Sequence, residues 1–364
     1  MKRISLALAA ALVAVGAPAA ASTALVPLLP EPSGPHRVGV VDLHLVDHSR
    51  LDPWDPARGD REVPVSVYYP AARTSGYPVA PHMPPALAAA FGELHARWVA
   101  PALPDSGVDW AGTVTHAHAG APPVAGKRPV LVYTPGGGDP RVLGTALATD
   151  LASRGFVVVT VDHPGDVSVV RLASGEVRIA DPAADPRTPS GYRKVLGVRV
   201  ADVRFVLGAL EGRDLGRVMD LRRVGVVGHS IGGSAAAQVL FEDRRVDAAV
   251  NLEGFLDYTG GGLLPVAERG TRKPLLLFGT DGYWNERYAL GWGAMLRSGC
   301  RTTQRMVRGA THWVFTDHAA VVPQLHGAGL MTVAQRDELV GAIEPERALP
   351  LVWGQVAGFF GSAL

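Results

Sequence analysis

The chain has 364 residues, of which 47% are hydrophobic and 19% are charged. This composition is typical of a globular protein with one large core. The formal net charge is +1, from 35 basic and 34 acidic side chains, and the sequence contains no long basic run. We therefore expect no nucleic-acid partner, because nucleic-acid-binding proteins gather an excess of Lys and Arg.

The N-terminus has the pattern of a secretory signal. Lys2 and Arg3 are followed by the apolar run Ile4–Val15 and then by small residues at Ala19–Ala21, which fit a cleavage site. The apolar run is too short to cross a bilayer core of about 30 Å. We predict a signal peptide over residues 1–24 and a secreted mature protein; an N-terminal anchor that is never cleaved is the alternative.

Cys300 is the single cysteine of the chain. No internal disulfide can form, so the core must stabilise the exported fold by itself, which a chain of this size can do. The residues around Cys300 have no feature of a catalytic turn, and we interpret it as a structural or surface thiol.

In the first third of the mature chain, two segments have the β-branched and aromatic character of strands: Val38–Val46 and Val63–Tyr69. Residues 70–128 are rich in Pro, Ala and Gly and contain one predicted helix, Ala86–Val99. We predict a single domain over residues 25–364, in which residues 70–128 form an insertion. Its helix either packs against the sheet or covers a substrate pocket.

From Pro129 onward, short apolar segments alternate with amphipathic ones. The predicted strands are Val130–Tyr133, Phe156–Val161, Val224–Val227, Val246–Leu252, Pro274–Phe278 and Gln304–Val307. The predicted helices are Arg141–Arg154, Tyr192–Leu210 and a stretch that starts at Ile231. This alternation predicts an α/β fold with a mostly parallel central sheet and helices on both faces. In such sheets the reacting groups gather at the carboxyl ends of the strands.

One motif carries the chemistry. Gly228-His229-Ser230-Ile231-Gly232 matches G-x-S-x-G and lies between a predicted strand and a predicted helix. The five-residue pattern alone is weak, but this placement is that of the nucleophile elbow of the α/β-hydrolase fold. The two glycines permit the crowded turn that exposes the hydroxyl, so the motif predicts Ser230 as the nucleophile.

A serine hydroxyl needs a general base within hydrogen-bond reach. The α/β-hydrolase fold places its histidine in a loop after the last strand, and His312 follows the predicted strand Gln304–Val307. His318 is expected to join the next helix, and His229 adjoins Ser230 on a tight turn and points elsewhere. The sequence therefore predicts His312 as the base.

The acid that orients the imidazole should come between the serine and the histidine. Glu253 ends the predicted strand Val246–Leu252, and Asp281 follows the predicted strand Pro274–Phe278. General features of the fold slightly favour Asp281, although an aspartate in this setting is also typical of an ordinary turn. The residue pattern leaves both candidates open.

An oxyanion hole needs two preorganised backbone N–H groups. We expect one from Ile231, the residue after the nucleophile, and one from Gly137 in the glycine loop after Val130–Tyr133. A phosphate-binding role for that loop is the competing interpretation, and it is disfavoured because no Gly-Lys-Ser/Thr sequence follows. His116 and His118 alternate like a metal pair, but no second ligand cluster accompanies them. We therefore expect neither a metal nor a cofactor.

Five pieces of the sequence occur in a familiar order: Val67–Pro70, Leu151–His163, Gly228–Gly233, Asn251–Phe255 and His312–Asp317. In these pieces the chain resembles the platelet-activating-factor acetylhydrolase family and the related secreted bacterial lipases and esterases. The likeness covers most of the mature chain. Each piece is unspecific, whereas their order and spacing together are fairly specific.

The resemblance bears on the acid and on the oxyanion loop. The family carries its triad aspartate in a Leu-Asp pair after the strand that follows the elbow helix, and the matching pair here is Leu252-Glu253. This favours Glu253 over Asp281, provided that a shifted backbone or rotamer accommodates the longer side chain. The family's oxyanion loop usually begins with His-Gly; here it reads Pro135-Gly136, which keeps the backbone donors and removes an imidazole.

We predict a serine carboxylic-ester hydrolase that works through an acyl-enzyme, with Ser230, Glu253 and His312 as its triad. The resemblance implies short-chain acyl esters or phospholipid esters as substrates, with transient contact with lipid surfaces and no protein partner. A polyester or cutinase-type hydrolase and a serine peptidase or amidase are the alternatives. A non-catalytic binding module is the least favoured interpretation, because both the nucleophile and the histidine are present.

Overall fold

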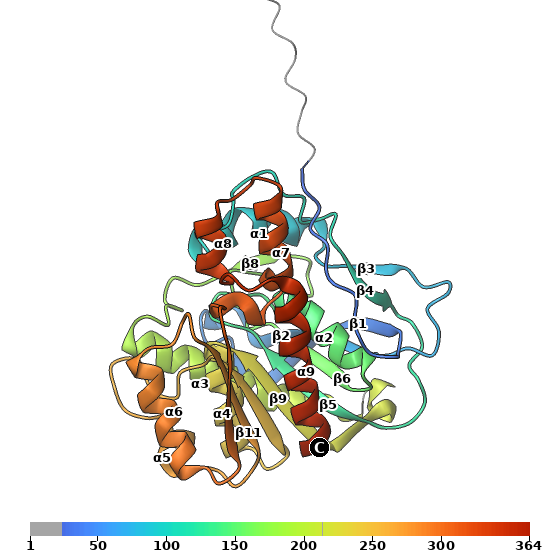
Figure 1. Cartoon of the computed structure of the whole chain (residues 1–364). Coiled ribbons are helices and arrows are strands. Elements are labelled where there is room, and N and C mark those ends of the chain that lie inside the picture. The colour runs from blue at the N-terminus through green and yellow to red at the C-terminus, as the bar shows by residue number, and fades with distance from the viewer. Residues whose placement is uncertain (1–23, 213) are drawn as a thin grey trace, which may run out of the picture.

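The computed structural model describes residues 24–212 and 214–364 (Figure 1). Residues 1–23 of the predicted signal peptide lie outside the described residues. Within the described ranges, no helix has the length and apolar character needed to cross a membrane.

A ten-stranded sheet forms the centre of the molecule, in the spatial order β12-β11-β10-β9-β5-β6-β2-β1-β4-β3. Its strands are β1 (Val38–Leu51), β2 (Asp60–Pro70), β3 (Val79–Pro81), β4 (Val114–Ala119), β5 (Arg128–Thr134), β6 (Val157–Val161), β9 (Met219–His229), β10 (Ala248–Leu252), β11 (Leu275–Thr280) and β12 (Thr302–Val307). The six strands from β12 to β6 are mutually parallel, whereas β2 is antiparallel to both of its neighbours. This arrangement is the α/β-hydrolase fold, as predicted.

Helices cover both faces of this sheet. The helices of the described residues are α1 (Pro85–Trp98), α2 (Thr145–Ser153), α3 (Pro189–Ala209), α4 (Ile231–Glu242), α5 (Pro265–Arg269), α6 (Glu286–Ser298), α7 (His318–Gly327), α8 (Val333–Leu339) and α9 (Pro345–Ala363). Four 3-10 turns, η1 (Pro56–Arg58), η2 (Arg141–Gly144), η3 (Asp214–Val218) and η4 (His312–Phe315), and the hairpin β7 (Val169–Arg171)–β8 (Val177–Ile179) complete the fold.

The core divides into two layers because strand side chains alternate between the faces. In β5, Val130 and Val132 pack with α3 and α4, whereas Leu131 and Tyr133 pack with α2 and α9. All four side chains are at most 1% exposed. A strand buried on both faces explains why the parallel segments appear in the sequence as continuous apolar runs.

The insertion over residues 70–128 contains more structure than its composition suggested. Besides α1 it contributes β3 and β4, which extend the sheet beyond β1. The sequence missed both strands, because β3 is three residues long and β4 alternates with polar residues. Helix α1 packs against β7 and joins a third apolar cluster with α7 and α8, above the central sheet in Figure 1.

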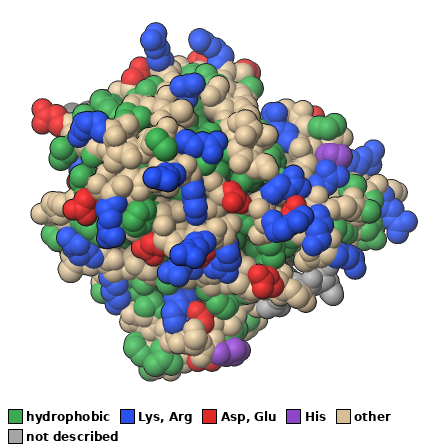
Figure 2. All heavy atoms as spheres, turned by 90° about the horizontal axis from the view of Figure 1, so that it is seen from below, with side chains coloured by type: hydrophobic (Ala, Val, Ile, Leu, Met, Phe, Trp, Pro, Cys, Tyr) green, Lys and Arg blue, Asp and Glu red, His purple; other side chains and the backbone are tan. Residues whose placement is uncertain are grey.

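The end of the molecule opposite α1, α7 and α8 carries many exposed basic side chains. Exposed basic residues precede five parallel strands: Lys127 before β5, Arg217 before β9, Arg244 before β10, Arg272 before β11 and Arg301 before β12. Figure 2 shows the resulting face, on which Lys and Arg side chains outnumber acidic ones. The amino ends of parallel strands meet at one edge of a sheet, so basic residues that are dispersed in the sequence become neighbours.

Candidate active site

Ser230 lies on a sharp turn between β9 and α4. Its backbone has φ 54° and ψ −126°, a strained conformation for a residue with a side chain. A side chain at Gly228 would collide with the carbonyl of Gly232, and one at Gly232 would collide with the carbonyls of the loop after β5. Both glycines of the motif are therefore required by close backbone contacts, as expected of an elbow.

Glu253 and His312 are brought together at the same edge of the sheet. The Glu253 Oε2 atom lies 2.8 Å from His312 Nδ1, and both residues are buried. Across the sheet, the backbone N–H of Ser230 donates to the carbonyl of Leu252 at 2.8 Å. The residue before Glu253 is thus hydrogen-bonded to the candidate nucleophile.

The second carboxylate oxygen of Glu253 is also held. Its Oε1 accepts hydrogen bonds from the backbone N–H of Thr280 at 2.5 Å and from the Thr280 hydroxyl at 2.6 Å. Thr280 ends β11. The longer glutamate side chain therefore starts on β10 and places its carboxylate beside the end of β11, which is where an acid following β11 would have been expected.

Asp281 has a different environment. Its side chain is exposed and accepts a hydrogen bond from the backbone N–H of Gly309 at 2.8 Å. This contact ties two loops together and leaves the carboxylate away from the imidazole that Glu253 holds. The geometry therefore makes Asp281 a loop-capping residue.

Two non-glycine residues within the described ranges have a positive φ: Ser230 at 54° and Glu253 at 57°. Such a conformation costs on the order of 1–3 kcal/mol and persists only where the surrounding structure imposes it. In the sequence, the two elbow glycines already indicate a strained turn at Ser230. The strain at Glu253 had no sequence signal.

The two candidate oxyanion donors are neighbours. A Cβ placed on Gly137 would lie 3.5 Å from the Ile231 side chain, in ordinary van der Waals contact. The start of α4 packs directly on the end of β5 and the loop after it, because a Cβ on Gly232 would collide with the carbonyl oxygens of Thr134 and Pro135. The N-terminus of α4 and the glycine loop therefore face each other beside Ser230.

The alternating histidines His116 and His118 lie in β4. Their rings contact the main-chain carbonyls of Leu29 and Tyr77, each at 2.8 Å. Among residues 24–212 and 214–364, no group of three or more His, Cys, Asp or Glu side chains is arranged to hold a metal ion.

Comparisons with known proteins show what the chain is similar to. Residues 27–172 match the family model described as platelet-activating factor acetylhydrolase, isoform II. A probable 1-alkyl-2-acetylglycerophosphocholine esterase of Arthroderma benhamiae is 28% identical over 356 residues, which cover 93% of this chain and 88% of the relative. The platelet-activating factor acetylhydrolase of Canis lupus familiaris is 24% identical over 36% of each chain.

A solved structure is similar over nearly the whole chain. The ferulic acid esterase from Streptomyces cinnamoneus has 35% sequence identity and a TM-score of 0.78, with 93% of each chain covered. The chain belongs to the platelet-activating-factor acetylhydrolase-like family of α/β-hydrolase esterases. It is an ester hydrolase.

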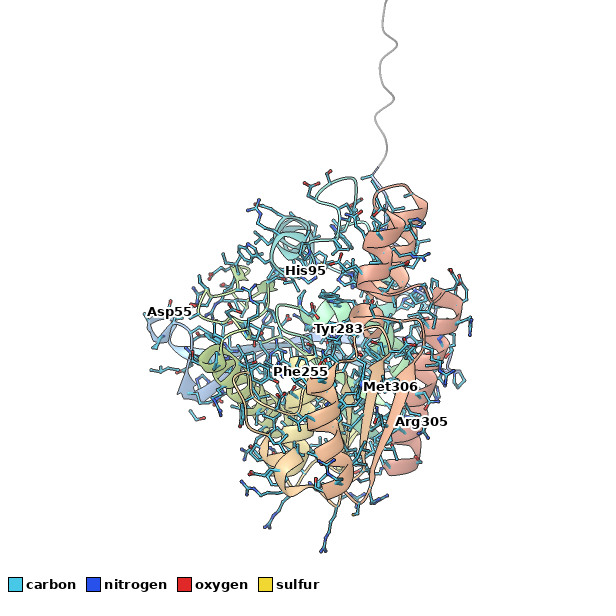
Figure 3. The ribbon with its side chains drawn as sticks, turned by 60° about the vertical axis from the view of Figure 1, so that its left-hand side comes forward. Asp55, His95, Phe255, Tyr283, Arg305 and Met306 are labelled. Atoms are coloured by element: carbon cyan, nitrogen blue, oxygen red, sulfur yellow. The ribbon has the colours of Figure 1, made fainter. Side chains whose placement is uncertain are left out.

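In this acetylhydrolase-like enzyme, an aromatic cluster lies beside His312, the candidate base. The Tyr283 ring stacks on the His312 imidazole, with centroids 4.2 Å apart, and remains 40% exposed. Phe255 stacks on Tyr288 at 4.1 Å, and the Arg287 guanidinium lies 3.8 Å from the centroid of the Phe255 ring. Tyr283 and Phe255 are marked in Figure 3. They provide apolar surface next to the reacting groups.

The environment of His312 favours the neutral ring that a general base requires. Burial lowers the pKa of His312, and the neighbouring His229 lowers it further, while the hydrogen bond to Glu253 opposes both effects. The unprotonated imidazole is therefore retained to a lower pH than in a free histidine.

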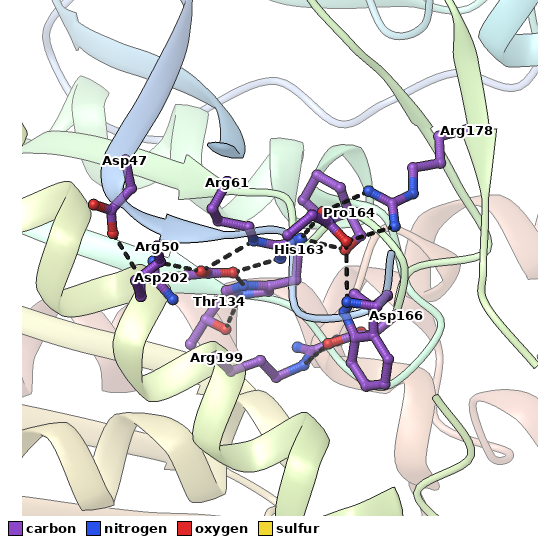
Figure 4. A network of polar contacts seen from close by, with 12 residues as sticks. Asp47, Arg50, Arg61, Thr134, His163, Pro164, Asp166, Arg178, Arg199 and Asp202 are labelled. Atoms are coloured by element: carbon purple, nitrogen blue, oxygen red, sulfur yellow. Dashed lines mark hydrogen bonds and ion pairs between the residues drawn. The ribbon is translucent and has the colours of Figure 1, made fainter. Parts of the chain in front are cut away.

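A buried arginine, Arg199, anchors the loop that carries Gly137, and Figure 4 shows its contact with Asp166. Arg199 of α3 is 0% exposed. It donates to the carbonyl of Pro135, to the carbonyl of Gly136 at 2.9 Å and to both carboxylate oxygens of Asp166. These carbonyls belong to the loop that carries Gly137, so the guanidinium fixes the direction of its peptide groups. Sequence analysis missed Arg199, because nothing local marks it.

A second network lies beside the first. His163 contacts the Thr134 hydroxyl at 2.9 Å and Asp202 at 3.0 Å, and Asp202 also accepts from Arg61 at 2.7 Å. The network joins the ends of β5 and β6 to α3 and β2. The loops at the carboxyl edge are therefore braced by buried ions.

Replacing Arg199 by methionine is expected to lower the free energy of unfolding by about 3–5 kcal/mol, because the Asp166 charge stays buried without its partner. Urea denaturation at neutral pH measures this change. The matched control is Arg58→Met, which removes an exposed pair with Glu176 and is expected to cost less than about 1 kcal/mol. Equal losses of unfolding free energy in the two variants would contradict the prediction that the buried pair contributes more to stability than the exposed pair.

Proposed function

We propose that this esterase works through an acyl-enzyme formed on Ser230, with His312 as general base and Glu253 as the orienting acid. The observation that supports this most strongly is the 2.8 Å contact between His312 Nδ1 and Glu253 Oε2 at the same sheet edge as the elbow serine. Because Nδ1 donates to the carboxylate, Nε2 carries the lone pair that can take the proton of Ser230.

The reaction runs in two halves. Ser230 Oγ attacks the ester carbonyl carbon while His312 Nε2 takes its proton, and the carbonyl oxygen becomes an oxyanion held by the N–H groups of Gly137 and Ile231. The C–O bond to the alcohol then breaks, and His312 returns the proton to the leaving oxygen. Water repeats the sequence on the acyl-serine and releases the carboxylic acid. No step requires a metal or a cofactor.

We infer that the substrates are short-chain acyl esters, including acetyl esters of phospholipids, and that the enzyme acts outside the cell. The first inference is supported by the names of the acetylhydrolase and 1-alkyl-2-acetylglycerophosphocholine esterase relatives. The second is supported by the signal-like pattern of residues 1–24. N-terminal sequencing of protein recovered from the medium tests the second, since it should begin near residue 25.

Esters of aromatic acids are a second candidate substrate class. Two observations favour them: the half-exposed ring of Tyr283 stacked on His312, and the 35% identity to a ferulic acid esterase. A planar aromatic acyl group gains about 0.5–1.5 kcal/mol from stacking beyond the burial of its surface. Replacing Tyr283 should therefore weaken turnover of an aromatic acyl ester more than turnover of an acetate.

The substrate class is tested with p-nitrophenyl esters from acetate to palmitate, methyl ferulate and a matched acetyl amide. We expect kcat/KM to be highest for acetate or butyrate and to fall with chain length, with negligible amide cleavage. Preference for palmitate would contradict the short-chain proposal and indicate a lipase. A higher kcat/KM for methyl ferulate, lost in Tyr283→Ala, would establish the aromatic class instead.

A further inference from the structure

The histidine inside the elbow motif has two acceptor partners. The His229 side chain is 1% exposed. Its Nδ1 lies 3.2 Å from Asp139 Oδ2, and its Nε2 lies 3.1 Å from the backbone carbonyl oxygen of His312. A neutral imidazole has one N–H and one lone pair. Its two partners here are both acceptors, a carboxylate and a carbonyl. A neutral ring would therefore place its unprotonated nitrogen against an acceptor oxygen, with no hydrogen between them, in a buried site.

We propose that His229 is held as an imidazolium ion paired with Asp139, and that this buried pair is a positioning element that joins the oxyanion loop to the loop of His312. Both ring nitrogens then donate, and every contact is a hydrogen bond. The proposal rests on the proposed function, because it concerns the placement of His312 as the base.

The ionisation of Asp139 agrees with this assignment. Burial opposes ionisation, but the hydrogen bond from His229 and the nearby imidazoles outweigh it and lower the pKa of Asp139 to about 2. The carboxylate is 2% exposed. A charge buried this deeply requires a counter-ion.

His229 is the cation that fits, because the other imidazoles near Asp139 are neutral. His95 of α1 has its Nε2 3.9 Å from Asp139 Oδ1, and burial lowers its pKa to about 3 despite the carboxylate. Burial likewise lowers the pKa of His318, on α7, to about 4. Neither ring carries a charge near neutral pH.

The pair lies directly under the oxyanion loop. A Cβ on Gly136 would lie 2.4 Å from Asp139 Oδ2 and 2.9 Å from His229 Nδ1. The backbone N–H of Asp139 donates to the Gly136 carbonyl at 3.1 Å. Glycine at this position therefore leaves room for the ion pair, and Gly137 follows it in the chain. One end of the pair supports the expected oxyanion donor, and the other end holds the carbonyl of the base.

The charge also acts on the base. The His229 and His312 rings have centroids 4.5 Å apart. His312 is faced by His229 from the elbow, by the Glu253 carboxylate at the end of β10 and by the Tyr283 ring from the loop after β11. The carboxylate of Asp139, on the far side of His229, raises the pKa of His312. A positive His229 opposes a second positive charge on His312, so it keeps the base unprotonated at lower pH.

The protonation state is tested first, in the unaltered protein. Nitrogen-15 NMR of histidine-labelled enzyme at about pH 8, well above the ordinary histidine pKa of about 6.5, should show one ring with both nitrogens protonated. His229→Gln assigns that signal by its loss. A single ring proton on His229 at this pH overturns the proposal, and this result does not depend on any activity measurement.

The role is tested by the pH profile of kcat/KM for p-nitrophenyl acetate. In His229→Gln, the acidic limb should move to higher pH by about one unit, because the positive charge that opposes protonation of His312 is lost. His118→Gln, which removes a half-buried ring bonded to a carbonyl in β4, should leave the limb in place. An unmoved limb in His229→Gln, with only a lower plateau, contradicts the positioning role.

The failure of this inference is separable from failure of the proposed function. If Ser230→Ala is inactive and His229 is neutral by NMR, the inference alone is wrong. If Ser230→Ala remains active, the proposed mechanism is wrong, whatever the state of His229.

Discussion

Replacing Ser230 by alanine is expected to lower kcat/KM for p-nitrophenyl acetate by about 10⁴- to 10⁶-fold. Removal of the hydroxyl abolishes the acyl-enzyme, so that only the oxyanion donors and substrate binding remain to assist direct attack by water. The fold should survive, because alanine adds no atom to the turn and the backbone hydrogen bond from residue 230 to Leu252 is retained.

Initial-rate kinetics measure this loss, with circular dichroism and thermal unfolding to confirm that the variant is folded. The control is Ser362→Ala, since Ser362 is exposed near the end of α9 and its hydroxyl contacts only carbonyls of its own helix. Activity should stay at the level of the unaltered enzyme in this control. Substantial esterase activity in purified Ser230→Ala would refute the nucleophile assignment.

Replacing Glu253 by alanine is expected to lower kcat by about 10³- to 10⁴-fold, as loss of the triad acid does in serine hydrolases. The imidazole would lose both its orientation and the charge that stabilises its protonated form. Asp281→Ala is expected to change kcat by less than about threefold, because an interaction at an exposed turn contributes little. Asp281 contacts the N–H of Gly309 and no group of the site.

The two acids are compared under identical conditions, together with Glu253→Gln, which keeps the shape of the side chain and removes its charge. If charge is what matters, Glu253→Gln should lose nearly as much activity as Glu253→Ala. A large loss in Asp281→Ala with a small loss in Glu253→Ala would reverse the assignment and return the acid to its general position after β11.

The sequence alone indicated the central parallel strands of the sheet and two residues of the candidate site, but not β3 and β4. Strands buried on both faces must be continuous apolar runs, and β5, β6, β10 and β11 are visible for that reason. Ser230 is recognisable because the elbow demands glycines at fixed spacing, and His312 because it follows the last parallel strand. These signals lie within short segments of the chain, so they can be recognised without knowing which distant residues the segment contacts.

The choice between Glu253 and Asp281 depended on where a side chain ends in space. Both follow parallel strands, and both are acidic. A backbone with φ 57° directs the glutamate across to Thr280, so that its carboxylate meets the imidazole. A resemblance favoured Glu253, whereas the spacing of the residues could not.

The sequence by itself indicated the elbow, the candidate base and the buried parallel strands, because each is encoded within a few neighbouring residues. Only the tertiary structure decided the partners of Arg199 and His229, which lie 33 or more positions away in the chain. The tertiary structure also produced the basic face, where single basic residues that precede five parallel strands become neighbours. Buried ion pairs form where the folded chain brings opposite charges together. The periodicity of a sequence does not indicate which distant residues will be neighbours, so such pairs cannot be predicted from it.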